Sequence, residues 1–348
     1  MKLRKNNLLS LDRFIDKSLY NKKLGYYMKG NPFGGEGDFI TSPNISILFS
    51  EMIAIWVISF WESLNCPKQF NLIELGAGNG EMINIMASTF YKFPQFKNSC
   101  NIKILEKSKL LRKIQKNNIQ DQQVKWLNNL NELDSLPCIF IANEFFDALP
   151  IKQYIKKNKK WYERYVKFTS QIKLEYLDVP FDIKKLEKKI KFRISSNQNF
   201  IEYSPLASKY LKDITNKIKL NNGGILIIDY GYIDKKMKNT IQAVSKHKYT
   251  DVLTNFSNSD ITYNLSFNLI NQMVKKLGSF SQAITTQKEF LINLGIQERA
   301  KILSKNMPFS KKADMYFRIK RLIDDKQMGK LFKVLLISNK KSKFKLGF

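Results

Sequence analysis

The sequence is poor in the residues that build metal sites and covalent frameworks. Its 348 residues include one histidine and three cysteines, Cys66, Cys100 and Cys138. Cysteines so few and so scattered exclude a disulfide framework and a Cys-x-x-Cys site, and they fit a reducing compartment. One histidine excludes a zinc site built on histidines, and a Ser-His-Asp triad would have to use His247. We therefore expect no metal and interpret His247 as structural.

Long apolar segments are also missing. The longest strongly apolar run, residues 52–61, is far shorter than the ~18 residues that mark a membrane span. The basic N-terminus lacks the apolar stretch of a secretory signal, and no GxxxxGK[ST] phosphate loop occurs. We expect a cytoplasmic chain without a membrane span.

Arginine is scarce although the chain is strongly basic. There are 51 lysines and 8 arginines against 30 acidic residues, which leaves a formal charge of +29. Such a surplus suggests a polyanionic partner such as RNA. Base and phosphate recognition favours the arginine fork, however, and lysine lacks it. We favour compositional drift as the source of the charge and do not expect a nucleic-acid partner, while an RNA methyltransferase stays an alternative.

The middle of the chain alternates apolar strands with helices. Continuous apolar runs interleaved with helices predict a mostly parallel sheet covered on both faces, which is a Rossmann-like α/β fold. We divide the chain into an N-terminal helical region with a glycine-rich loop (1–69) and a Rossmann-like domain (70–348), with a β-rich insertion near 151–203 and a helical insertion near 245–325. The predicted strands are Phe70–Leu75, Asn101–Leu105, Gln123–Leu127, Cys138–Ala142, Gly224–Asp229, Gln282–Thr286 and Phe332–Ser338.

A glycine motif follows the first of these strands. Residues 74–80 read ELGAGNG, and Glu81 begins the next predicted helix. Glycines let the backbone approach a ligand, and a helix N-terminus favours an anionic group. A dinucleotide-binding GxGxxG motif would need a glycine at position 81, where this chain has Glu81. The spacing is instead GxGxG, and Glu74 lies two residues before its first glycine, Gly76. This is the first motif of Rossmann-like S-adenosylmethionine (SAM) methyltransferases, and an ordinary tight turn is the alternative.

Two further groups of polar residues follow strands. Glu106 ends the second strand, where a carboxylate can accept both hydroxyls of a ribose, although it could also be a plain surface residue. Asn143, Glu144 and Asp147 follow the apolar fourth strand. Ligands of such sheets bind at the carboxyl ends of the strands. We expect Asn143 to bind the cofactor or the acceptor nitrogen, and the two acids to hold a cationic acceptor; Asp147 could instead cap a helix.

A long loop precedes the sheet. Residues 25–43 contain five glycines and two prolines, which disfavour helix and strand. Loops of this length are commonly functional. We expect Asn44 to cap the helix that follows, which runs to about Ser63.

These motifs, in this order, resemble the MidA-like family, which includes the mitochondrial complex I assembly methyltransferase. The resemblance covers nearly the whole chain, and its most specific segments are GDFITSP at 37–43 and NEFFDALP at 143–150. It implies a class I SAM methyltransferase fold, with SAM as cofactor and a protein substrate. It also implies symmetric dimethylation of an arginine in the quinone-side core subunit of respiratory complex I during assembly.

The resemblance assigns residues to roles. It implies that Gly76, Gly78 and Glu106 bind SAM, and that a loop with Gly37, Asp38, Thr41, Ser42 and Pro43 closes over it. We add Glu74, Ala77 and Asn143 to the residues that bind SAM. To this we add Asn143, Glu144 and Asp147 as catalytic residues, and Asp38, Glu144 and Asp147 as contacts of the arginine substrate.

The chain departs from the family pattern in the glycine motif and in one later segment. The glycine motif of the family reads ELGPGRG, and here Ala77 and Asn79 replace Pro and Arg. Where the family has DLTAHVDF, residues 260–267 replace His by Asn264 and Asp by Ser266. A SAM-fold assembly chaperone without catalysis is therefore a second alternative. The sequence leaves the oligomeric state open, a homodimer included.

Overall fold

The computed structural model describes residues 7–29, 41–121, 123–169, 173–245 and 248–348. The chain folds into two compact units, and it passes from one to the other several times, so that each unit is made of three separate stretches of sequence. The first unit combines residues 1–30, 146–212 and 232–278, and the second combines residues 31–145, 213–231 and 279–348. Gly37, Asp38 and His247 lie outside the described residues, and the division expected between residues 69 and 70 stays a prediction.

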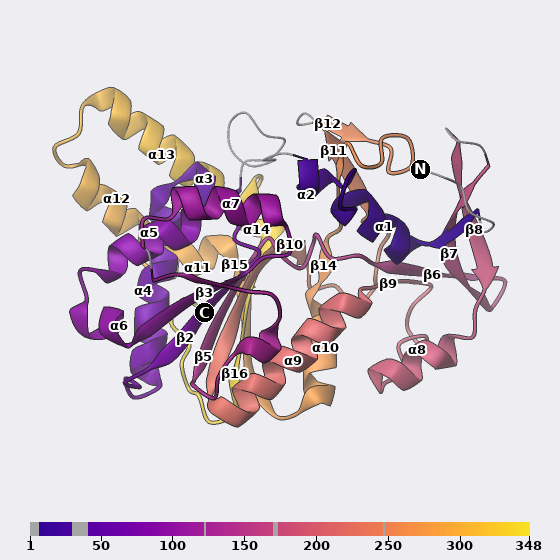
Figure 1. Cartoon of the computed structure of the whole chain (residues 1–348), viewed down its shortest axis with the longest axis horizontal. Helices are drawn as coiled ribbons and strands as arrows, with labels where there is room; N and C mark the ends of the chain where they lie inside the picture. The colour runs from indigo at the N-terminus through magenta and orange to yellow at the C-terminus, as the bar shows by residue number, and fades with distance from the viewer. Residues whose placement is uncertain (1–6, 30–40, 122, 170–172, 246–247) are drawn as a thin grey trace. The chain divides into compact units, whose positions relative to one another are not determined.

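The second unit is built on the mixed sheet that Figure 1 shows at its centre. Pairing is parallel from β10 through β5, β2 and β3 to β4, whereas β16 runs antiparallel to both β10 and β15. In spatial order the strands are β15 (Phe280–Thr286), β16 (Phe332–Asn339), β10 (Gly223–Tyr232), β5 (Cys138–Asn143), β2 (Phe70–Leu75), β3 (Cys100–Leu105) and β4 (Lys125–Leu127).

Ten helical segments lie wholly within the described part of this unit. They are α3 (Ser42–Ile45), α4 (Ile47–Ser63), α5 (Glu81–Phe90), α6 (Pro94–Ser99), α7 (Lys109–Asn118), the short 3₁₀ helix η1 (Leu130–Glu132), α11 (Gln287–Asn293), α12 (Ile296–Ser304), α13 (Phe309–Ile323) and α14 (Met328–Leu331). A further helix, α9 (Pro205–Asn221), begins in the first unit and ends in the second.

Both faces of the sheet are buried, as the continuous apolar strands predict. Along β10, Leu226 and Ile228 belong to the large core cluster, whereas the alternate residues Ile225 and Ile227 are equally buried outside it. Since successive side chains of a strand point to opposite faces, each face of the sheet is covered. The predicted Rossmann-like α/β fold is therefore confirmed.

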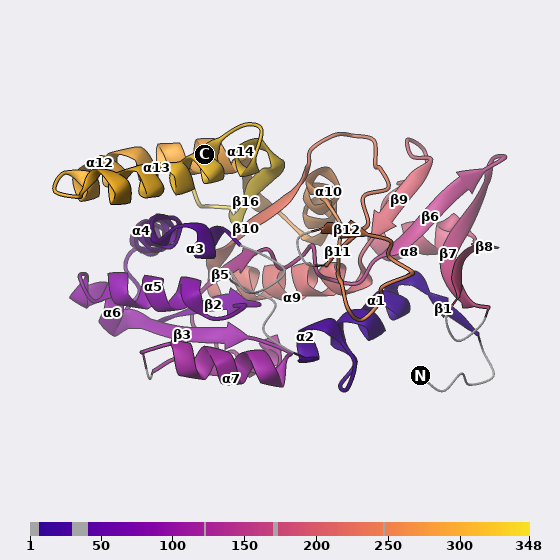
Figure 2. The ribbon, with the colours of Figure 1, turned by 90° about the horizontal axis from the view of Figure 1, so that it is seen from above.

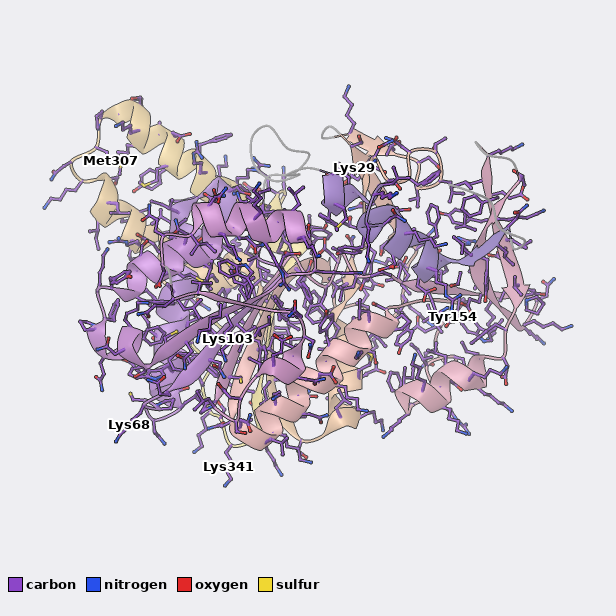
Figure 3. All side chains as sticks on the ribbon, viewed as in Figure 1. Lys29, Lys68, Lys103, Tyr154, Met307 and Lys341 are labelled. Atoms are coloured by element: carbon purple, nitrogen blue, oxygen red, sulfur yellow. The ribbon has the colours of Figure 1, made fainter. Side chains whose placement is uncertain are left out.

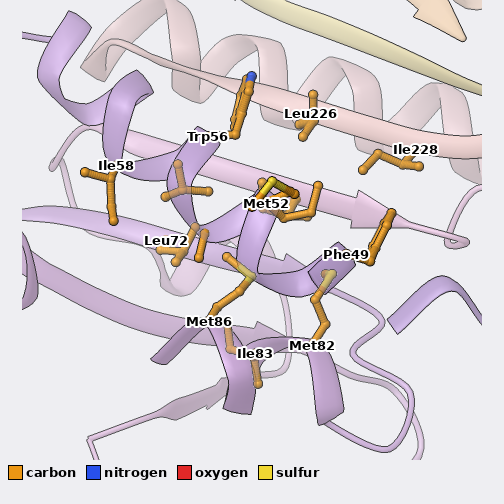
Figure 4. Packing of buried hydrophobic residues seen from close by; sticks show 14 of the residues in the cluster. Phe49, Met52, Trp56, Ile58, Leu72, Met82, Ile83, Met86, Leu226 and Ile228 are labelled. Carbon is orange, nitrogen blue, oxygen red and sulfur yellow. The ribbon is translucent and has the colours of Figure 1, made fainter. Parts of the chain in front are cut away.

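Helix α4 lies at the centre of the core cluster. It is apolar all round, which is typical of a helix that is buried on every side. Figure 4 shows its residues Phe49, Met52 and Trp56 packed among side chains of β2, α5 and β10. This packing fixes the first turn of α4 and the short helix α3 beside the glycine motif, because α3 contacts both α4 and α5.

The first unit contains antiparallel sheets. In one sheet β7 pairs with β1, β6 and β8, and β6 pairs with β9; in the other, β11 lies between β12 and β13. Its strands are β1 (Leu8–Ser10), β6 (Lys152–Lys157), β7 (Lys160–Phe168), β8 (Leu174–Pro180), β9 (Phe200–Tyr203), β11 (Gln242–Ser245), β12 (Lys248–Thr250), β13 (Asp260–Thr262) and β14 (Leu265–Ser266). Its helices are α1 (Leu11–Tyr20), α2 (Tyr26–Lys29), α8 (Ile183–Ile190) and α10 (Phe267–Leu277).

The alternating pattern after Ile151 forms the expected hairpin. The last paired residues of strands β6 and β7 are Lys157 and Lys160. The two residues between them, Asn158 and Lys159, form the turn and have φ values of +47° and +62°. Two left-handed residues make the turn that matches the twist of a hairpin.

One predicted helix cap is wrong. Asn44 lies inside α3, and Ser46 is the residue whose side chain accepts the Leu48 N–H at the start of α4. Asn44 instead contacts Glu81 with its side-chain amide. Both residues favour caps, and the break in the backbone between α3 and α4 decides which of them serves.

Candidate functional site

The glycine motif forms a tight turn whose three glycines have left-handed backbone conformations. Gly76, Gly78 and Gly80 have φ values of +68°, +54° and +86° between β2 and α5. A Cβ on Gly76 would lie 2.8 Å from the ring of Phe145. The Gly76 N–H donates to the Leu105 carbonyl at 2.9 Å, which ties the turn to the end of β3. The backbone at this turn can therefore approach a ligand closely.

Two buried carboxylates flank the turn. Glu74 and Glu106 are 4% and 7% exposed at the ends of β2 and β3. Burial, and then the nearby charge of Glu106, raises the pKa of Glu74 to about 8. Burial also raises the pKa of Glu106, against hydrogen bonds that lower it. Glu74 Oε2 is buried without a hydrogen-bond partner among the described residues. A ligand that donates hydrogen bonds or carries positive charge would stabilise both groups.

Gln115 holds Glu106 in place, and the sequence analysis missed it. Its buried amide donates to Glu106 Oε2 at 3.3 Å and to the Gly78 carbonyl at 2.9 Å, and it accepts the indole N–H of Trp126 at 2.8 Å. The Ser108 N–H donates to the other oxygen of Glu106 at 2.7 Å. The sequence did contain a signal for a buried Gln115. It lies four residues after the apolar Leu111, and residues four apart share one face of a helix, which here is the buried face of α7.

The third group lies at the end of β5. Glu144 has a φ of +50°, and its N–H donates to the Ile228 carbonyl at 2.9 Å. A non-glycine residue in this conformation is strained, and such strain gathers at functional sites. Asn143 is nearly buried, and its Oδ1 has no hydrogen-bond partner among the described residues. Its amide donates to Glu144 Oε1 at 3.4 Å.

The end of the glycine-rich loop lies at the same edge of the sheet. The Ser42 N–H donates to Glu144 Oε1 at 3.1 Å, and Thr41 Oγ1 donates to Asn44 Oδ1 at 2.8 Å. Pro43 is buried in the first turn of α3, and Ala77 is buried in the core cluster. The described members of the predicted site, Asp147 excepted, thus gather at the carboxyl ends of β2, β3 and β5 within one unit.

Asp147 belongs to the other unit. No helix begins there, so the interpretation of Asp147 as a helix cap is wrong. It is buried, and its charge helps to raise the pKa of Tyr27, although burial and Asp260 contribute more. The Tyr27 hydroxyl donates to Asp260 Oδ1 at 2.8 Å. Asp147 therefore shares a buried acidic region with residues from two other sequence motifs.

Of the two residues that replace His and Asp in segment 260–267, Ser266 makes a hydrogen bond with its side chain and Asn264 with its backbone. The Ser266 hydroxyl accepts the Leu269 N–H at 3.3 Å and caps α10. Serine and aspartate are both preferred caps, so Ser266 can replace an aspartate in this role. The Asn264 N–H donates to Thr240 Oγ1 at 3.0 Å.

The chain is similar to known proteins over most of its length. The model of a family described as S-adenosyl-L-methionine-dependent methyltransferase matches residues 52–285. Curated relatives include protein arginine methyltransferase NDUFAF7, mitochondrial, from Xenopus tropicalis (28% identical, 95% of this chain, 83% of the relative) and from Homo sapiens (26% identical, 95% and 80%).

A solved structure shares the fold. It is a COG1565 superfamily member from Burkholderia thailandensis bound to S-adenosyl-homocysteine, which aligns with a TM-score of 0.82 at 22% identity over 98% of this chain and 90% of that chain. A native structure of a COG1565 superfamily protein from the same organism aligns with a TM-score of 0.79 at 21% identity, over 98% and 89%.

Proposed function

The chain belongs to a family of S-adenosyl-L-methionine-dependent methyltransferases, and from this premise we propose that it methylates an arginine side chain of a protein. Its cofactor is SAM. When bound, SAM supplies a methyl group on a positively charged sulfur that is already activated for transfer. The protein must align the acceptor nitrogen with that methyl group and exclude water.

The residues at the sheet edge fit this cofactor. Glu106 is oriented by Ser108 and Gln115 and can accept ribose hydroxyls, as acids at this position do in dinucleotide folds. Glu74 Oε2 and Asn143 Oδ1 are buried acceptors without a hydrogen-bond partner among the described residues, so they suit an ammonium group. The turn at Gly76 and Gly78 lets the backbone approach the cofactor. We propose that these residues, with Thr41, Ser42 and Pro43, hold SAM.

We propose that Glu144 binds the guanidinium group of the substrate arginine. An arginine side chain stays protonated at neutral pH, so its nitrogens donate and do not attack. A carboxylate held at a fixed place can accept two guanidinium N–H bonds, localise the positive charge and take up the proton. Ser42, Asn143 and the Ile228 carbonyl fix Glu144 for this task. Asp147 belongs to the first unit, and its contact with the substrate stays a prediction from the sequence.

The observation that supports the proposed arginine methylation is the similarity of nearly the whole chain to its curated relatives. The relatives that match 95% of the chain are named as protein arginine methyltransferases. On the resemblance to the MidA-like family we extend the proposal to symmetric dimethylation of an arginine in a core subunit of respiratory complex I. Acidic side chains at the sheet edge suit a cationic acceptor better than a nucleic-acid backbone.

The test is methyl transfer from labelled SAM to the candidate subunit, with the modified residue mapped by mass spectrometry. We expect dimethylarginine at one site, with one methyl group on each of the two terminal nitrogens. We expect no label when that arginine is replaced by lysine. Calorimetry with SAM is run in parallel. Cofactor binding without any labelled arginine would overturn the proposed substrate while leaving the methyltransferase assignment intact.

A further inference from the structure

The helical hairpin of α12 and α13 carries an apolar surface that no described element covers. Figures 1 and 2 show the two helices side by side at one end of the second unit. On α13, Phe309, Ala313 and Phe317 follow one another at four-residue spacing and are all exposed, Phe309 to 86% and Phe317 to 69%. Residues four apart share one face of a helix. The opposite face is buried through Ile319 and Leu322.

Two further exposed apolar residues lie near the turn of the hairpin. Ile302 near the end of α12 is 68% exposed, and Met307 in the turn is also exposed. Figure 3 labels Met307 at this tip. We call these five residues, Ile302, Met307, Phe309, Ala313 and Phe317, the hairpin stripe. Exposed apolar residues gathered in one hairpin mark an interaction site.

The hairpin is rich in exposed basic side chains. Residues 296–323 contain five lysines and three arginines but only two acids, Glu298 and Asp314. Two of the arginines are paired with acids, because Arg299 binds Glu51 of α4 at 2.9 Å and Arg318 binds Asp314, one turn earlier on α13, at 2.8 Å. The lysines are all exposed, and they are Lys301, Lys305, Lys311, Lys312 and Lys320. The charge that faces solvent around the stripe is therefore mainly lysine.

We propose that this hairpin docks the protein on the surface of an anionic lipid bilayer. The hairpin stripe would enter the boundary between headgroups and acyl chains, and the lysines would contact the lipid phosphates. An apolar face with aromatic residues, flanked by lysines, is the pattern of helices that lie in a membrane interface. Each basic residue near an anionic leaflet contributes about five-fold to binding.

A bilayer fits this surface better than a protein does. Lysine is depleted in the cores of protein interfaces, where arginine is enriched. A protruding helical tip needs a complementary groove on a protein partner, whereas a bilayer accepts it without one. No helix among the described residues is long and apolar enough to cross a membrane. The proposed contact is thus one of the surface only, and it does not depend on the proposed arginine substrate.

Co-sedimentation of the full chain with vesicles tests the proposal. One set of vesicles is phosphatidylcholine, and the other contains one third phosphatidylglycerol. We expect binding to the anionic vesicles to be at least about 10-fold stronger. The double variant Phe309→Ser and Phe317→Ser should lose about 10-fold or more, because two exposed aromatic rings no longer enter the interface. The double variant Lys311→Glu and Lys312→Glu should lose a similar or larger factor.

Matched controls lie elsewhere on the surface. Leu220 is 79% exposed on α9, so Leu220→Ser removes an equally exposed apolar side chain. Lys184 and Lys185 are exposed on the basic helix α8, so their change to glutamate alters the total charge equally. Both controls should bind the anionic vesicles within about three-fold of the unchanged protein.

Three outcomes would overturn the proposal. The first is equal binding to neutral and anionic vesicles. The second is unchanged binding by the Phe309→Ser and Phe317→Ser variant, with its melting temperature also unchanged. The third is a dimer in solution that this variant dissociates while vesicles bind neither protein, which would assign the hairpin stripe to a second copy of the chain.

Discussion

The Ser42 N–H donates to the Glu144 carboxylate at 3.1 Å, which joins two residues 102 positions apart in the sequence. The two most specific motifs of the chain therefore meet at one oxygen atom. Ser42 is the first residue of α3, and its side chain is fully buried. The contact places the end of the glycine-rich loop against the carboxylate that we propose to bind the substrate.

The first prediction uses this backbone contact. Ser42→Pro removes the N–H donor at the first position of a helix, where proline is tolerated. We expect methyl transfer to fall about 10-fold or more, because Glu144 loses one of the bonds that orient it. Ser42→Ala keeps the N–H and should stay within about three-fold of the unchanged enzyme. Initial rates with labelled SAM give the comparison, and equal rates for both variants would contradict it.

The variant Glu144→Gln shows how much of the methyl-transfer rate depends on the Glu144 carboxylate, for comparison with Ser42→Pro. It keeps the shape of the side chain but removes its charge and its ability to take up a proton. We expect a loss of about 100-fold or more in rate, with SAM affinity nearly unchanged. Glu62→Gln, at an exposed position of α4, is the matched control.

The second prediction concerns the glycine turn. Gly76→Ala places a methyl group 2.8 Å from the Phe145 ring at a φ of +68°. We expect SAM affinity to fall at least about 10-fold, because the turn or the ring must shift. Gly295→Ala has a similar φ of +84°, but its nearest atom is 3.8 Å away. It should cost about 1 kcal/mol of stability and leave SAM affinity unchanged. Calorimetry and urea unfolding measure the two effects, and weaker SAM binding by both variants would count against a local cause.

The third prediction assigns Gln115 a positioning role. Gln115→Leu leaves the Trp126 indole N–H and the Gly78 carbonyl without their partner, which should cost about 1–3 kcal/mol of stability. Because Glu106 also loses a donor, we expect SAM to bind about 10-fold more weakly.

Asn118 offers the control for Gln115. It lies on the same helix and donates to the Asn79 carbonyl at 3.0 Å, but on the exposed side. Asn118→Ala should change SAM affinity by less than about three-fold. If Gln115→Leu lowers stability without weakening SAM binding, the positioning role is wrong.

The fourth prediction concerns Glu74 and pH. Burial and the charge of Glu106 raise its pKa from 4.5 to about 8 in the folded protein. The folded state therefore holds this proton more tightly than the unfolded chain does. Without cofactor, the free energy of unfolding should fall as pH rises from about 5 to about 8, by up to about 1.4 kcal/mol per pH unit from this group.

Glu74→Gln removes this titration without changing the size of the side chain. Its free energy of unfolding should decrease less than that of the unchanged protein over the same pH interval. Urea unfolding at several pH values measures both slopes, and Glu62→Gln controls for the loss of one charge. Parallel slopes for the protein and its Glu74→Gln variant would show that Glu74 does not titrate in this range.

Local pattern predicted the elements well. Strand β2 has the predicted bounds and helix α5 begins at Glu81 as predicted, since apolar continuity and helical spacing are properties of adjacent residues. The errors concern residues whose role depends on where the backbone bends. Asn44 and Asp147 have the chemistry of helix caps, but neither caps a helix in the structure.

The sequence by itself determined the sheet, the glycine turn and the family, because strand hydrophobicity, glycine spacing and motif order are all local. Only the tertiary structure decided that Ser42 contacts Glu144 and that Gln115 joins Glu106 to Gly78. These contacts link residues far apart along the chain, and packing of α4 and α7 on the sheet sets their distances. The same holds for the hairpin stripe, since apolar residues in a sequence do not reveal whether another element covers them.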